Sequence, residues 1–482
     1  MSVSTAPLVA TELRLHRRHH VLAATGAMTA LWVPLLVALP APWRADALAW
    51  LLLLDIATLG LYFAPALAVV ERANGVTAAL RLTRLTPLRA LAVRVATLAL
   101  WAVGAAAVLL AVTRVAAWPT VLLGVVLTSV LFSLLAIAMV GRAETLTTYL
   151  ARVPLVAGPL LLPALLRGTG LVDSPMLALS PVTGALDLLT GRWSAAHAGW
   201  LLVAIGLLGL MVVRLGFDVR PQRFAPAGRW PTLRPFAGPR WWRVARSYAT
   251  TDVRTLLGDR LLLLLLVGVP IIAVAVRVAS GVGLDWLEQR HGVDASQHLP
   301  VMWAFVLVVH LPVMAGTLAG LLFLEDRDAD LLPALTTTRA SLHTLLAYRL
   351  TVTVTAAAAF MAAGMLIAGV RHPLGWPGLL LTALAGATVS VVPAMLLASL
   401  GRDRVQGMAL MKMMGLPLYV PIAWWYVDGP AGWLFGLIPT GWAAQTFWAT
   451  SVPQALGFGV GAMASSAVLA VVLARHLLRS VT

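Results

Sequence analysis

Long runs of apolar residues alternate with short charged segments along this chain of 482 residues. A membrane-spanning helix needs about 20 apolar residues, because the hydrocarbon core of a bilayer is about 30 Å thick. Twelve runs approach or reach that length, and the fifth run of each half is short and rich in proline. The pattern therefore predicts an all-α polytopic membrane protein with about twelve transmembrane helices. The predicted spans are residues 21–41, 47–70, 90–112, 119–140, 153–169 and 198–215 in the first half, and 260–280, 300–324, 344–370, 376–400, 411–428 and 455–476 in the second.

Composition agrees with the hydropathy pattern and excludes a soluble globular protein. Hydrophobic residues make up 60% of the chain and charged residues only 11%, and the mean hydropathy is +0.90. The net charge of +16 comes from arginines clustered in alternate loops. Because basic residues near span ends stay on the cytoplasmic side, these loops and both termini are expected in the cytoplasm. Nucleic-acid binding would need a soluble basic domain, and the sequence offers none.

Five landmarks of the first half return in the same order in the second half. They are Thr11–Arg14 and Thr251–Arg254, Glu71 and Glu325, LRALAVR (88–94) and LHTLLAYR (342–349), Gly141-Arg142 and Gly401-Arg402, and SPVTGA (180–185) and IPTGWA (438–443). We therefore expect two parallel six-helix units in residues 1–216 and 251–482. Residues 217–250, rich in proline, glycine and arginine, are the predicted cytoplasmic linker.

Each unit is expected to begin with a helix that lies in the membrane interface. At the end of the linker, Trp241 and Trp242 stand beside Arg243, which suits indole rings at headgroup depth and a guanidinium on phosphate. The segment from about residue 8 to 20, which contains Arg14, is its predicted counterpart. The alternative is an ordinary basic linker.

Several of these features together resemble the permease subunits of ABC-2 type exporters. The features are an interface helix before six spans, an acid closing the second span, and a basic loop with the pattern Leu-x-x-Leu-Thr-Pro-Leu at residues 82–88. ALWVPLLVALP (30–40), Asp55 in DIATLGLYF, Glu71 and TRLTPLRAL (83–91) make the first half similar to actinobacterial fluoroquinolone and multidrug-export permeases. In the second half, Thr338-Arg339 stands where Thr-Pro is expected, and the loop is acidic.

The resemblance implies export of drugs or other amphipathic small molecules across a bacterial plasma membrane, driven by ATP. A P-loop needs a glycine-rich turn followed by lysine and Ser or Thr, but Lys412, in LMKMMG, is the only lysine of the chain. We therefore expect a transport permease that is not itself an enzyme and binds no cofactor. Two copies of a separate ABC ATPase subunit would bind ATP and magnesium.

The loop after the second span of each unit is the expected contact with that ATPase. Charge complementarity would set partner choice there, and the first loop is basic while the second is acidic. Ordinary solvated loops are the alternative interpretation. The predicted coupling residues are Glu71, Arg81, Arg84, Thr86, Pro87 and Arg89 in the first unit, and Glu325, Asp326, Thr338 and Arg339 in the second.

Charged and aromatic residues inside the spans suggest a substrate pathway. Asp55 in the second span and His310 in the eighth occupy nearly equivalent repeat positions and are predicted to pair across the pathway. A buried pair that only stabilises the fold is the alternative. Aromatic residues and methionine would adapt to varied substrates, although such side chains also face lipid or neighbouring helices. Those predicted to line the pathway are Tyr62, Phe63, Trp303, Phe305 and Met314.

Two other classes of protein remain open from the sequence. A twelve-helix secondary transporter would share parallel halves, but the loop after the second span lacks the Gly-x-x-x-Asp-Arg pattern of the major facilitator class. A membrane-embedded transferase would need acids or histidines clustered at one membrane face. Only the outer loop 285–298 approaches this: Glu288 and His291 could share a helix face and bind a metal, but a solvated loop without a metal is the favoured interpretation.

Overall fold

The computed structural model describes most of the chain, with gaps that include the predicted linker. The described residues are 6–39, 41–73, 76, 86–141, 146–170, 172, 174–214, 260–292, 294–328, 342–402, 404–427 and 429–481. Every regular element within these ranges is a helix, so the predicted all-α membrane fold is confirmed. Internal contacts divide the chain into two units, Met1–Thr232 and Leu233–Thr482, and each is described by itself. The linker 217–250 lies outside the described residues.

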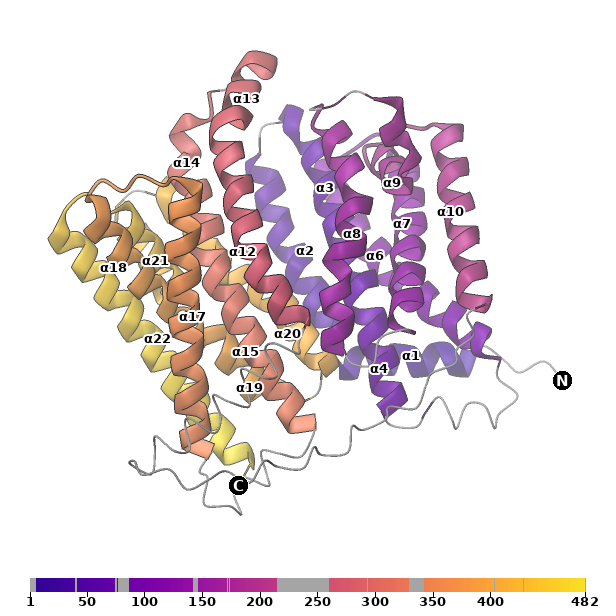
Figure 1. Ribbon diagram of the computed structural model, residues 1–482. Coiled ribbons are helices and arrows are strands. Elements are labelled where there is room, and N and C mark those ends of the chain that lie inside the picture. Colours follow the sequence, from indigo (N-terminus) through magenta and orange to yellow (C-terminus); the bar gives the residue numbers. More distant parts are fainter. Residues whose placement is uncertain are drawn as a thin grey trace. The chain divides into compact units, whose positions relative to one another are not determined.

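Unit 1 is a bundle of long apolar helices around α7 (Figure 1). The helix α7 contains no charged residue and is buried along most of its length against α3, α6, α9 and α10. The elements of this unit are α1 (Ala6–Arg18), α2 (Val21–Ala38), α3 (Ala41–Thr58), η1 (Leu59–Phe63), α4 (Ala64–Ala73), α6 (Pro87–Thr113), α7 (Trp118–Val140), α8 (Leu146–Gly168), η2 (Pro175–Leu179), α9 (Pro181–Leu189) and α10 (Ala195–Arg214).

The helix α1 lies across one end of the unit 1 bundle and is not one of its long spans (Figure 1). Its axis makes an angle of 64° with that of α2, and His20, in the left-handed conformation with φ 57°, stands between the two helices. The segment ends with His16, Arg17 and Arg18, which favours a position at the membrane surface. The helix α1 thus occupies the place of the predicted elbow helix of residues 8 to 20, and we call it the elbow helix, although its position in the membrane interface stays a prediction.

Unit 2 contains a similar order of long helices and short segments. Its elements are α12 (Arg260–Val278), η3 (Ala279–Gly283), α13 (Leu284–His291), η4 (Ser296–His298), α14 (Leu299–Trp303), η5 (Ala304–His310), α15 (Leu311–Asp328), α17 (Leu342–Ala368), α18 (Gly375–Thr388), α19 (Val391–Leu400), α20 (Arg404–Tyr419), η6 (Val420–Tyr426), η7 (Pro430–Leu437), α21 (Pro439–Trp448) and α22 (Val452–Val481). In both units a short helix that begins with proline, α9 or α21, precedes the last long helix.

Nine helical segments in the described ranges are long and apolar enough to cross a membrane, or ten if α1 and α2 count as one broken span. The predicted number of about twelve spans stays a prediction, because parts of the chain lie outside the described residues. The fifth predicted run of each unit is not among these segments. In unit 1 it is α8, which contains Pro154, Pro159 and Pro163, and in unit 2 the α-helix α20 ends at Tyr419 and continues as the 3-10 segment η6. Proline removes a backbone donor and crowds the preceding turn, yet α8 is one continuous helix through all three of its prolines.

Glycines bring the second and fourth long spans of each unit into close contact. In unit 1, a Cβ on Gly60 would lie 2.7 Å from Cβ of Phe132. In unit 2, a Cβ on Gly316 would overlap the carbonyl oxygen of Ser390, and one on Gly320 would lie 2.6 Å from Cβ of Leu397. Small residues promote helix packing in lipid because they let backbones approach. The repeat stays a prediction, and this shared contact supports it.

Candidate functional site

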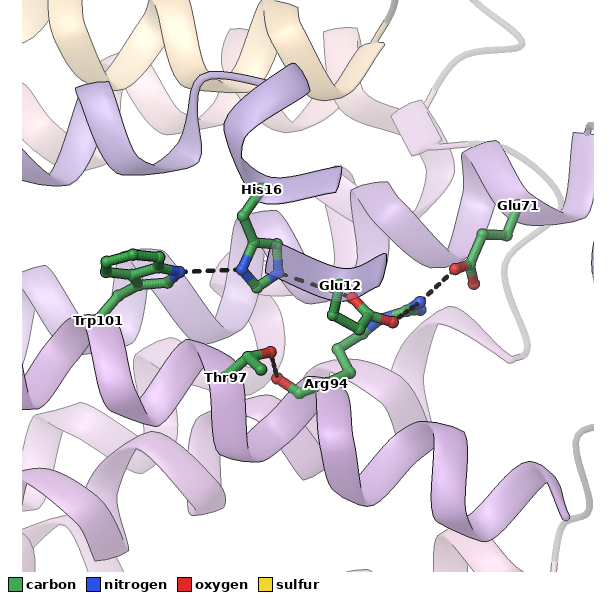
Figure 2. Close-up of polar contacts among 6 residues, drawn as sticks. All are labelled: Glu12, His16, Glu71, Arg94, Thr97 and Trp101. Carbon is green, nitrogen blue, oxygen red and sulfur yellow. Dashed lines mark hydrogen bonds and ion pairs between the residues drawn. The ribbon is translucent and has the colours of Figure 1, made fainter. Parts of the chain in front are cut away.

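A buried arginine joins the elbow helix to the second and third spans of unit 1 (Figure 2). Arg94 on α6 donates from Nη2 to Oε1 of Glu12 on α1, at 2.8 Å, and also to Oε1 of Glu71 near the end of α4. These side chains are only 10%, 8% and 20% exposed, respectively. Removing charges from water is costly, and close opposite charges offset that cost. We call these three residues the elbow latch.

A second contact fixes the protonation state of His16 beside the elbow latch. The indole Nε1–H of Trp101 donates to Nδ1 of His16 at 3.0 Å, as Figure 2 shows. Because an indole nitrogen can only donate, Nδ1 must accept, and the proton of the neutral ring sits on Nε2, 3.8 Å from Oε2 of Glu12. Burial of the ring, with the positive charge of Arg94, lowers the pKa of His16 to about 4. The ring is therefore neutral at physiological pH.

Unit 2 contains an ion pair at the equivalent place. Arg349 near the start of α17 donates to Asp326 near the end of α15. In both units the acid and the arginine are 23 residues apart in the sequence, as the separations of Glu71 from Arg94 and of Asp326 from Arg349 show. The spacing identifies Asp326 as the counterpart of Glu71, where the sequence predicted Glu325, whose side chain lies outside those that the structure describes.

The position of these ion pairs suggests what they do. In unit 1, the elbow latch connects the end of α4 to the start of α6, and connects both to α1. In unit 2, the pair of Asp326 and Arg349 connects the end of α15 to the start of α17. A force applied to either segment would therefore act on two spans together, and in unit 1 also on the elbow.

Some of the predicted coupling residues belong to these ion pairs, and others are exposed at the surface. Glu71 and Asp326 belong to the ion pairs, so their carboxylates face arginines of their own unit. Thr86 and Arg89, at the start of α6, are exposed. Pro87 occupies the first turn of that helix. The predicted residues Arg81, Arg84, Thr338 and Arg339 lie outside the described residues, so their coupling role stays a prediction.

In unit 1, the predicted pathway residues lie around a wide turn in the second span. Leu59–Phe63 form a π-helical segment, a geometry frequent at functional sites. The hydroxyl of the buried Tyr149 donates to the carbonyl oxygen of Leu61 at 2.5 Å. Phe63 and Asp55 are almost completely buried and Tyr62 is partly exposed. The Asp55 side chain is therefore largely removed from water.

In unit 2, His310 and Phe305 converge on Tyr419 of α20. Nδ1 of His310 lies 2.5 Å from the Tyr419 hydroxyl, and the Phe305 ring centroid lies 4.9 Å from that of Tyr419. Trp303 and Met314 are partly exposed. The predicted pairing of Asp55 with His310 would join the two units and stays a prediction.

The remaining predicted residues belong to the interface helices and the outer loop. Arg14 is exposed on α1, and its Nε donates to the carbonyl oxygen of Ala10 at 3.2 Å. Trp241, Trp242 and Arg243 lie outside the described residues. Glu288 is exposed on α13, and no group of three or more potential metal ligands forms in the part of the chain that is described.

Sequence reasoning missed three important residues of this site. The sequence placed Glu12 and His16 in a predicted interface helix and showed Arg94 only as part of a repeated motif. In the structure all three side chains are buried. The available signal was an arginine several residues inside an apolar run, repeated as Arg349 in the second unit. A charge at such a position is costly without a partner, so each arginine implied an acid nearby.

Comparison with known proteins agrees with the predicted resemblance. Residues 252–477, just under half of the chain, match the family of Rv2686c-like fluoroquinolones export permease proteins. Two relatives from Mycobacterium tuberculosis, the fluoroquinolones export permease proteins MT2760 and Rv2686c, are each 27% identical over 217 residues. That alignment covers 84% of each relative but 45% of this chain. The resemblance to export permeases is confirmed. The family match falls in the second half of the chain, whereas the sequence predicted the closer resemblance in the first half.

Proposed function

We propose that this chain, which is similar to fluoroquinolone-export permeases, is the transmembrane permease of an ATP-driven ABC exporter. The chain has no P-loop lysine, because its only lysine lies in LMKMMG, so the ATPase would be a separate subunit that binds ATP and magnesium. Its substrates would be drugs or other amphipathic small molecules. The membrane would be a bacterial plasma membrane, with both termini in the cytoplasm.

The observation that carries this proposal is the acid–arginine pair at the same place in both units. Each pair joins the end of the second span to the start of the third, with the same separation of 23 residues. The loop between those spans is where the resemblance expects an ATPase subunit to bind. Two such loops would engage two ATPase copies, one for each unit.

The mechanism follows from the connections of the elbow latch. Closure of two ATP-bound subunits would move the loops, and Arg94 would pass that movement to α4, α6 and α1 together. The second span continues from α4 into η1, which packs tightly on α7 at Gly60. The helices of the bundle would thus switch between inward and outward access, with ATP acting through its different affinity for the two states.

Affinity purification in mild detergent tests the proposal. We expect a P-loop ATPase to co-purify at about two copies for each chain, and Arg89→Glu to weaken its retention because it reverses an exposed loop charge. Arg114→Glu is the matched control, since Arg114 is an exposed arginine at the opposite end of α6. A chain that purifies alone and still transports substrate would contradict the proposal.

A further inference from the structure

A polar cavity lies in unit 1 at the end of the bundle opposite the elbow helix. It has a volume of about 260 Å³ and is formed where α8 ends, across α9 and the turn that follows it, and where α10 begins. Basic residues are normally depleted on the outer side of a membrane protein, so arginines gathered there require an explanation. The lining residues are Arg167, Gly168, Thr183, Leu186, Asp187, Arg192, Ser194 and His197.

Asp187 in this cavity already has a close partner. Oδ2 of Asp187 lies 2.6 Å from Nδ1 of His197, which joins α9 to the start of α10. The two helices are also in close contact, because a Cβ on Gly184 would lie 2.9 Å from the carbonyl oxygen of His197. Neither of these two contacts between α9 and α10 involves the arginines.

The two guanidinium groups are held more loosely. Arg167 Nη1 and Arg192 Nη2 each lie 3.8 Å from a carboxylate oxygen of Asp187, beyond hydrogen-bonding distance. Nη1 of Arg167 is buried and has no hydrogen-bond partner among the described residues. Two arginines and one aspartate leave a net charge of +1, before any charge on His197 is counted. The cavity therefore has positive charge and N–H donors available for a further group.

We propose that this cavity binds an oxyanion, the carboxylate or phosphate group of a small molecule or of a lipid. Guanidinium groups donate in a planar fork that matches carboxylate and phosphate oxygens. Sites for whole drug-sized molecules usually exceed about 300 Å³, so the volume fits a headgroup or a small anion better. Thr183 and Ser194 supply hydroxyl groups in the same cavity.

The site belongs to one unit only. Aligning Thr183-Gly184 with Thr440-Gly441 places Ala449 of unit 2 where unit 1 has Arg192, and Ala444 where unit 1 has Asp187. The aromatic residues Trp424, Trp433 and Trp442 pack together around α21 instead. Anion binding is therefore expected at one site in each chain.

The test uses the purified full chain in detergent with three probes: inorganic phosphate, acetate and phosphatidylglycerol. Binding of the soluble anions is measured from the rise in unfolding temperature with anion concentration at constant ionic strength. Retention of phosphatidylglycerol is measured by native mass spectrometry. The variants are Arg192→Gln, whose side chain is 67% exposed and so tolerates replacement, and Arg167→Gln, with Arg114→Gln as the control.

We expect wild type and Arg114→Gln to bind one probe per chain, and both cavity variants to bind it about tenfold or more weakly. Saturation by phosphate or acetate identifies a soluble anion, and retention of phosphatidylglycerol alone identifies a lipid headgroup. Should Arg167→Gln fail to fold, Arg192→Gln decides the result. Equal binding by wild type and Arg192→Gln, or binding of none of the probes by wild type, would overturn the proposal. The test involves neither ATP nor transport, so it is independent of the exporter proposal.

Discussion

Replacing Arg94 should destabilise unit 1 more than any other single change of charge in the elbow latch. Arg94→Gln removes the cation that both Glu12 and Glu71 contact. The carboxylate of Glu12 would stay almost completely buried and that of Glu71 largely buried. Breaking a buried ion pair from one side costs about 3 to 5 kcal/mol, because the remaining charge has no compensation. We expect Arg94→Gln to fall in that range.

The two acids should cost less to replace. Glu12→Gln leaves Arg94 paired with Glu71, and its amide oxygen can still accept a hydrogen bond, so a loss of about 1 kcal/mol is expected. Arg94→Lys keeps the charge but loses the planar fork that reaches two carboxylates, so it should lie between Glu12→Gln and Arg94→Gln.

Denaturant titration in mixed micelles, followed by circular dichroism, measures these free energies of unfolding. Arg89→Gln, an exposed arginine on the same helix, is the control and should change stability by less than about 0.5 kcal/mol. In a double-mutant cycle, Glu71→Gln and Arg94→Gln should show a coupling energy of about 0.5 to 3 kcal/mol. If Arg94→Gln were no more destabilising than Arg89→Gln, the result would contradict the burial of Arg94 between Glu12 and Glu71.

Three further predictions follow from other contacts. The pKa of the buried His16 is lowered from 6.5 to about 4, so its contribution to the free energy of unfolding is complete above pH 6.5 and falls by about 3 kcal/mol as the pH drops to 4. In a series of unfolding measurements at different pH values, His16→Asn should remove this dependence on pH. Gly316→Ala should cost about 1 to 3 kcal/mol in thermal unfolding, because its Cβ would overlap the backbone of Ser390, just before α19. Gly104→Ala, with open space around it, should be neutral or slightly stabilising. Tyr149→Phe should cost about 1 to 3 kcal/mol by leaving the Leu61 carbonyl without its hydroxyl donor, and equal stability of the two proteins would contradict that bond.

The long spans could be predicted from the sequence because hydropathy over about 20 residues decides whether a helix can cross a bilayer. Spans such as Trp118–Val140 and Gly375–Leu400 agree with the predicted 119–140 and 376–400 within one residue at each end. The fifth run of each unit was harder to predict, because the sequence does not show that α8 stays helical through Pro154, Pro159 and Pro163, or that α20 continues as a 3-10 segment after Tyr419.

The site was only partly predictable for a different physical reason. Glu71 and Asp326 could be selected because an acid at the end of an apolar run is costly without a partner. The partner of Glu12 is 82 residues away, and no periodic pattern connects Glu12 to Arg94. The oxyanion cavity depends on Arg167, Asp187 and His197 from three helices, which only the packing of α8, α9 and α10 brings together.

ATP-driven transport by inside-out vesicles tests the central claim most directly. The vesicles would contain the chain with or without its co-purified ATPase, and uptake of a fluorescent fluoroquinolone would be followed after ATP addition. The account predicts uptake only when both polypeptides and ATP are present, with a large loss in Arg94→Gln vesicles that contain equal amounts of folded protein. Uptake by the chain alone, driven by an ion gradient and unaffected by ATP, would contradict it.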